Sequence, residues 1–98
     1  MSKTLQVKYA GEVQQVTTSN GSVMAKRNIV LTEKECRTGE NGLYLSDVDY
    51  AIDLLGDRAT QFDLTPGDWI VANLTMSARE YNGVYYPEVR LVRYCKMA

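Results

Sequence analysis

The chain has 98 residues, a formal net charge of −1 and no histidine. This length suits one domain with a single core, and we expect one domain over residues 1–98. Without histidine, the chain lacks the most common general base, the usual partner of a nucleophilic serine or cysteine, and a frequent zinc ligand. We therefore expect no enzyme activity, no catalytic residue, no cofactor and no metal site.

No apolar run approaches the roughly 20 residues of a membrane-spanning helix, and the N-terminal residues contain no continuous apolar segment of the kind found in secretory signals. These features predict a cytoplasmic protein with no membrane partner. Cys36 and Cys95 lie far apart without a C-x-x-C spacing, so we interpret them as structural thiols.

The charges are unevenly distributed along the chain. Of the 12 acids and 11 bases, seven acids and one base lie between residues 39 and 68, which leaves five acids and ten bases elsewhere. The overall charge is mildly unfavourable for a nucleic-acid-binding protein, which is more often basic. The uneven distribution nevertheless allows a folded domain with one basic and one acidic side.

The first 31 residues predict a β-hairpin. Residues 5–13 alternate between apolar and polar side chains, as in a half-buried strand, and Gly11 suits a bulge or a close backbone approach. Asn20-Gly21 favours a tight turn. Residues 24–31 form the returning strand, with Ile29 and Leu31 on one face. Residues 32–47 are polar, show no sustained period and are predicted to be a long loop.

The second half predicts three further strands and a helix. Residues 50–54 alternate as a strand whose outward face carries Asp49, Ala51 and Asp53. A short helix is expected over 57–62, with Asp57 as its N-cap. Strands follow at 69–78 and 84–94, joined by a turn at Asn82-Gly83. In the first of these, the residues predicted to face inward are Ile70, Ala72, Leu74, Met76 and Ala78.

Five strands with a helix between the third and the fourth are the layout of the OB-fold, a Greek-key β-barrel that often binds oligonucleotides. The predicted fold class is therefore all-β, a five-stranded OB-fold barrel. A five-stranded SH3-like barrel is the main competitor, and it is disfavoured because it has no helix at that place.

Four segments carry a resemblance to known families: KRNIVL at 26–31, LLGDRA at 54–59, PGDWIVANL at 66–74 and REYNG at 79–83. As a set they resemble a bacterial OB-fold family of unknown function. More distantly, Gly56, Ala59, Gly67 and Gly83 resemble positions of the bacterial single-stranded DNA-binding protein and the primosomal replication protein. The resemblance implies a non-enzymatic OB-fold domain that binds single-stranded DNA or RNA.

Six residues are the candidate nucleic-acid contacts. Cations can neutralise phosphates, and exposed rings can stack on bases. Tyr85 and Tyr86 must face opposite ways in a strand, so only one is expected to be available, and Arg90 shares the parity of Tyr86. Arg58, surrounded by acids, is expected to form local ion pairs. The candidates are Lys26, Arg27, Arg79, Tyr81, Tyr86 and Arg90.

A protein-interaction module is the alternative function, in which the domain self-associates or binds a replication or phage protein. The acidic outward face of residues 49–53 favours it, because those carboxylates would repel phosphate. A homodimer is also predicted, since Val71 and Val92 face outward by parity and an incompletely closed barrel leaves a free strand edge.

Overall fold

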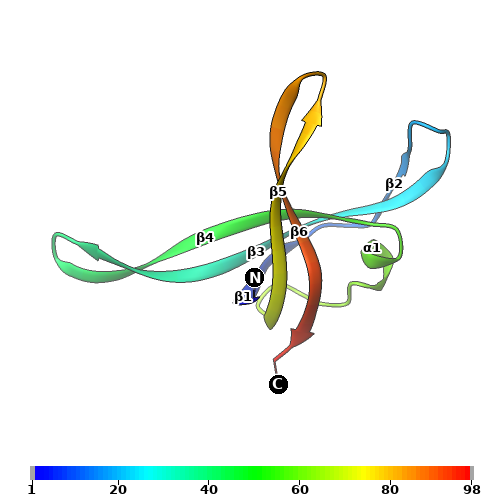
Figure 1. Ribbon diagram of the computed structural model, residues 1–98. Coiled ribbons are helices and arrows are strands. Elements are labelled where there is room, and N and C mark those ends of the chain that lie inside the picture. Colours follow the sequence, from blue (N-terminus) through cyan, green and yellow to red (C-terminus); the bar gives the residue numbers. More distant parts are fainter. Residues whose placement is uncertain (1, 98) are drawn as a thin grey trace.

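The computed structural model describes residues 2–97, which form six β-strands and one short helix (Figure 1). All the strand pairs are antiparallel, and the order β2-β3-β1-β5-β6 forms one sheet in which β4 also pairs with β3. The elements are β1 (Ser2–Ala10), β2 (Gln14–Thr17), β3 (Val23–Gly39), β4 (Gly42–Leu55), α1 (Asp57–Gln61), β5 (Trp69–Tyr81) and β6 (Val84–Lys96).

The first predicted strand is divided in two at Gly11. Both parts pair with β3, β1 near Leu31 and β2 near Ala25, so they follow one another along the same edge. Gly11 is buried, and its N–H donates to the Asn28 carbonyl over 2.9 Å. A Cβ at this position would lie 3.0 Å from that carbonyl oxygen. The close backbone approach expected at this glycine is thus present.

The predicted loop at 32–47 is wrong. This segment instead continues β3 and β4 as a hairpin, paired without interruption from Lys26 opposite Leu55 to Gly39 opposite Gly42. The alternation expected of a strand is missing here because the outer part of the hairpin extends beyond the core. Residues 36–45 are all exposed, so neither face is selected to be apolar.

A single hydrophobic core is formed by residues of β1, β3, β4, β5 and β6 together with α1 and the segment that follows it. The buried apolar residues of β1, β3, β4, β5 and β6 follow the alternation of the sequence, including Ile29 and Leu31 of β3. Two residues depart from it: Tyr9 shares the parity of Val7 but is exposed, and the polar Thr32 is buried. The core consists of Leu5, Val7, Ile29, Leu31, Ile52, Leu54, Ala59, Phe62, Leu64, Ile70, Ala72, Leu74 and Leu91. Met76 and Ala78 were predicted to face inward and do share the parity of Leu74, but both are exposed because β5 has left the core by this point.

Helix α1 closes one end of the core. Its Ala59 is buried, and so is Phe62, the first residue after the helix. The expected Asp57 N-cap is wrong: Gly56 occupies the cap position with φ at 63°, and no side chain of the described residues caps the helix. The positive φ of Gly56 suits a residue without a Cβ. Its N–H donates to the carbonyl of Ala25 over 2.8 Å, which fixes the turn against β3.

Strands β4 and β6 lie near one another, yet no ladder of paired residues joins them within residues 2–97. A side chain bridges part of this gap instead. Arg58 of α1 donates to the backbone carbonyls of Leu91 and Val92 in β6. The sequence predicted local ion pairs for Arg58, but its observed partners are these neutral carbonyls.

Two long β-ribbons project from the core in different directions, one formed by β3 and β4 and the other by β5 and β6 (Figure 1). The molecule consequently measures 55 by 38 by 21 Å along its principal axes. In the β5–β6 ribbon every residue from Thr75 to Pro87 is exposed. The backbone of this ribbon is paired, but its side chains have no core of their own.

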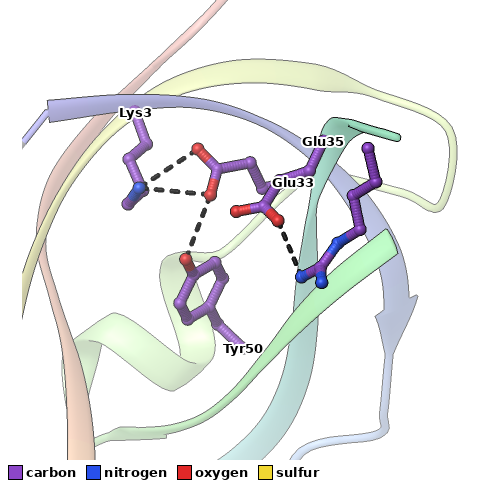
Figure 2. A network of polar contacts seen from close by, with 5 residues as sticks. Lys3, Glu33, Glu35 and Tyr50 are labelled. Carbon is purple, nitrogen blue, oxygen red and sulfur yellow. Dashed lines mark hydrogen bonds and ion pairs between the residues drawn. The ribbon is translucent and has the colours of Figure 1, made fainter. Parts of the chain in front are cut away.

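A polar network secures the base of the β3–β4 ribbon (Figure 2). Lys3 of β1 donates to both carboxylate oxygens of Glu33 over 3.1 Å, and the Tyr50 hydroxyl donates to one of them over 3.1 Å. The Glu33 carboxylate raises the pKa of Lys3, while burial and then the same carboxylate raise the pKa of Tyr50. The network therefore links β1, β3 and β4 where the ribbon leaves the core.

Candidate functional site

Four of the six candidate residues share one face of the β5–β6 ribbon. Arg79 lies directly opposite Tyr86, and Arg90 lies opposite Thr75. Successive side chains of a strand point to opposite faces, so residues two or four apart share a face. Tyr81 is therefore on the same face as Arg79, and Arg90 on the same face as Tyr86. We call Arg79, Tyr81, Tyr86 and Arg90 the cationic-aromatic face.

The side chains of this face are available to a ligand. Tyr81 is 65% exposed and Tyr86 is 46% exposed. Among the described residues, Arg79 has no carboxylate within ion-pair distance, whereas Arg90 Nε lies 3.4 Å from Glu88 Oε1. An exposed pair at that distance is a weak constraint. Both guanidinium groups can therefore reorient towards a phosphate.

An open groove of about 660 Å³ lies at the base of this ribbon. One wall is β4 around Asp53, and the other is the base of the β5–β6 ribbon, which contributes Arg79 and Arg90 from one face and Pro87 and Val89 from the other. Arg58 lines the groove from α1 and holds its β6 wall through the two carbonyl bonds described above. The groove thus extends the cationic-aromatic face towards the gap between β4 and β6.

The other two candidates have different surroundings. Lys26 lies opposite Leu55, a residue of the groove wall, and its ammonium is 3.6 Å from the Asp53 carboxylate. Lys26 itself does not line the groove, and its side chain is half-exposed. Arg27 points to the opposite side of β3, where it donates to the carbonyls of Gly11 and Phe62, each over 2.7 Å. Its guanidinium also lies 5.2 Å from the centre of the Phe62 ring.

Arg27 thus connects β3 with the segment between β1 and β2 and with the residue that follows α1. The structure does not bring it together with the other five candidates. Sequence parity could have suggested this difference, because Lys26 and Arg27 are neighbours in one strand and must point to opposite sides. The side chain of Arg27 has the same parity as the buried Ile29.

The acidic outward face of β4 is neutralised by lysines from neighbouring strands. Lys8 of β1 lies 2.6 Å from Asp49, and Lys34 of β3 lies 2.6 Å from Asp47. Asp53 accepts from Asn28 over 3.0 Å in addition to its ion pair with Lys26. The Lys8 ammonium lowers the pKa of Asp49, which keeps this carboxylate charged. Each of these aspartates is thus accompanied by a lysine.

Within residues 2–97, no group of three or more His, Cys, Asp or Glu side chains is placed to hold a metal ion. No helix in the same part of the chain is long and apolar enough to cross a membrane. Cys36 and Cys95 are both exposed free thiols.

The chain is similar to known proteins in its three-dimensional structure but not in its sequence. No protein-family model and no curated protein sequence matches the chain. Among solved structures, the small single-stranded DNA-binding protein from Streptomyces coelicolor matches with a TM-score of 0.55 and 12% sequence identity. The match covers 99% of this chain and 92% of that protein. At this identity the likeness shows the fold: a mostly β, OB-like arrangement over the whole described chain.

Proposed function

We propose that this protein binds single-stranded nucleic acid without catalysing a reaction, through the cationic-aromatic face and the adjoining groove. The observation that carries the proposal is the register of the β5–β6 ribbon, which places two arginines and two tyrosines on one exposed face. Rings stack on any base, and cations follow the phosphate backbone, so this combination suits a single strand of varied sequence. The structural likeness to a single-stranded DNA-binding protein supports the same function.

The proposal includes the finer fold. We count β1 and β2 as one strand of a five-stranded OB-fold barrel that is interrupted at Gly11. The missing ladder between β4 and β6 is then the seam of this barrel, bridged by Arg58. In the OB-fold, the hairpin loop between the last two strands commonly grips oligonucleotides. The cationic-aromatic face lies on the corresponding hairpin of this chain.

The ligand contacts that we propose are Lys26, Arg79, Tyr81, Tyr86 and Arg90. Arg27 is left out because backbone carbonyls and a ring already surround its guanidinium. The main reason for preferring a protein-interaction module was the acidic face of β4. That reason is weakened, because Asp47, Asp49 and Asp53 are each paired with a lysine and present little net negative charge.

Fluorescence anisotropy with a labelled oligonucleotide of about ten nucleotides, short enough for one copy to cover, tests the proposal. Each phosphate neutralised on a single strand contributes about −0.7 to the slope of log affinity against log salt. Three cations, Lys26, Arg79 and Arg90, therefore give an expected slope of about −2. A duplex of the same sequence should bind more weakly, because its bases are not free to stack on Tyr81 and Tyr86.

The adjacent tyrosines provide a matched pair of variants. Tyr86→Ala removes a ring from the cationic-aromatic face and should weaken binding by about 1–3 kcal/mol with an unchanged salt slope. Tyr85→Ala removes an equally large ring from the opposite face and should leave binding unaltered. Arg79→Ala should flatten the slope by about 0.7. Equal losses for the two tyrosine variants, or no binding at low salt, would contradict the proposal.

A further inference from the structure

A second, smaller pocket adjoins the groove where α1 meets the last part of β6. Its volume is about 260 Å³. Four residues line both the pocket and the groove: Leu54, Arg58, Leu91 and Val92. We call it the α1 pocket, and its shared lining makes it a continuation of the groove.

An irregularity in β6 shapes the wall of this pocket. The pairing with β5 moves from Leu91 opposite Leu74 to Arg93 opposite Asn73, so Val92 is an extra residue, as in a β-bulge. Successive carbonyls of a regular strand point to opposite edges. Here two successive carbonyls, those before and at the extra residue, both accept from the guanidinium of α1. Bulges are common beside functional sites, where they redirect side chains.

The groups that line the α1 pocket suit one flat, polar ring. Leu54 and Leu91 are buried and apolar. Arg58 and Tyr94 contribute a planar guanidinium and an aromatic ring, and Gln61, the last residue of α1, contributes an exposed amide. Proteins hold an unstacked nucleic-acid base in the same way, by stacking it on a ring or a guanidinium and bonding its polar edge.

Several of the polar groups remain available for a ligand. A guanidinium has five N–H donors, and the bonds to the two β6 carbonyls use two of those of Arg58. In the described part of the chain, Arg93 has no carboxylate within ion-pair distance, and the Gln61 amide has no hydrogen-bond partner. Burial, followed by the nearby Asp63 carboxylate, raises the pKa of Tyr94, so its hydroxyl stays protonated and can donate.

The Tyr94 ring is held in position before any ligand arrives. It packs on Phe62 with ring centres 5.7 Å apart and an angle of 56° between the planes. The side chain nevertheless remains 36% exposed. A ring that is already fixed loses little conformational freedom on binding, which favours affinity.

The volume of the pocket limits its occupant. Pockets that take a whole drug-sized ligand measure about 300–1,000 Å³, and the α1 pocket falls just below this range. One base is of suitable size, whereas a base pair or a folded segment of a partner protein is too large.

We propose that the α1 pocket receives one unstacked base of the single strand that lies in the groove. The base stacks on Tyr94 and presents its polar edge to Gln61. The inference rests on the proposed function, because the strand in the groove brings the base to the pocket. A strand that passes Arg79 and Arg90 along the groove reaches the shared wall at Arg58, and the α1 pocket adjoins that wall.

Fluorescence anisotropy of the full chain with two ligands of about ten nucleotides tests the proposal. One is an ordinary oligonucleotide, and the other has the same sugar-phosphate backbone without bases. Tyr94→Leu removes the ring but keeps an apolar side chain against Phe62. It should weaken binding of the ordinary oligonucleotide about fivefold or more, with an unchanged salt slope. Binding of the baseless strand should be unaffected.

Gln61→Ala provides a second variant that leaves the ring and its packing intact. Loss of one neutral hydrogen bond should weaken binding of the ordinary oligonucleotide about two- to tenfold, again without effect on the baseless strand. Gln15→Ala is the matched control, because Gln15 is also exposed and lies on β2, which contributes no residue to the groove or the α1 pocket. Circular dichroism checks that each variant is folded.

The results separate this inference from the proposed function. If Tyr86→Ala weakens binding while Tyr94→Leu and Gln61→Ala both bind the ordinary oligonucleotide like the wild type, only the base pocket is overturned. The pocket is also overturned if Tyr94→Leu weakens binding of both ligands equally, since the ring would then act through the fold. If the wild-type protein binds neither ligand at low salt, both proposals are rejected.

Discussion

Replacing Arg27 with alanine should strongly destabilise the fold while leaving the proposed ligand surface intact. In the structure this side chain holds two backbone carbonyls, one at Gly11 and one at Phe62, and its guanidinium stacks on the Phe62 ring. The bonds connect the interruption between β1 and β2 with the segment after α1. The substitution therefore removes one side chain that links three parts of the chain.

The magnitude follows from these contacts. A hydrogen bond from a charged donor contributes about 1.5–3 kcal/mol, and a cation over a ring adds about 0.5–1 kcal/mol at an accessible site. The terms are not additive, because water can solvate part of what is lost. We expect a loss of about 2–4 kcal/mol out of the 5–15 kcal/mol typical of a domain. For a chain of this size, that lowers the melting temperature by about 8–30 °C.

Urea denaturation followed by circular dichroism measures this loss. Arg37→Ala is the matched control, because Arg37 lies on the same strand, is largely exposed and, among residues 2–97, its side chain bonds to Glu35 alone. It should change stability by less than about 1 kcal/mol. Arg27→Lys should recover part of the loss, since an ammonium can bond one carbonyl but lacks the fork that reaches both.

If Arg27→Ala lowers the free energy of unfolding by less than about 1 kcal/mol, this reasoning is refuted. The two hydrogen bonds to the carbonyls would then make no net contribution to stability. Folded Arg27→Ala protein should also retain its oligonucleotide affinity and salt slope. A slope that becomes flatter by about 0.7 would instead restore Arg27 to the ligand contacts.

Two further predictions concern the body of the fold. The Lys8 ammonium lowers the pKa of Asp49, so this ion pair contributes stability above the unfolded-state pKa and loses it as pH falls through the folded pKa. In an NMR titration, Lys8→Met should shift the Asp49 pKa upward, and an unchanged value would show that the pair is not formed in solution. Gly11→Ala should cost about 1–3 kcal/mol in urea denaturation, because its Cβ would meet the Asn28 carbonyl oxygen at 3.0 Å. Wild-type stability in that variant would mean that β1 and β2 can shift apart without cost.

The sequence by itself determined most of the core and the order of its elements. Alternation identified Ile29, Leu31, Ile52 and Leu54 as inward, and all are buried. The turn at Asn82-Gly83 was identified because both residues can take positive φ, and they do so at 50° and 79°. These signals are local: they depend on the one or two residues around each position and on the period of the strand.

Only the tertiary structure decided how far the strands extend and what each charged residue does. Parity gives the face of a residue but not whether anything covers that face, so Met76 was expected in the core and is exposed. Arg27 and Arg79 are both strand arginines in the sequence, yet one is held by carbonyls from distant segments and the other is open on a ribbon. The acids of β4 meet lysines from β1 and β3, up to 41 residues away in sequence. Such partners are set by strand pairing, and no local pattern encodes them.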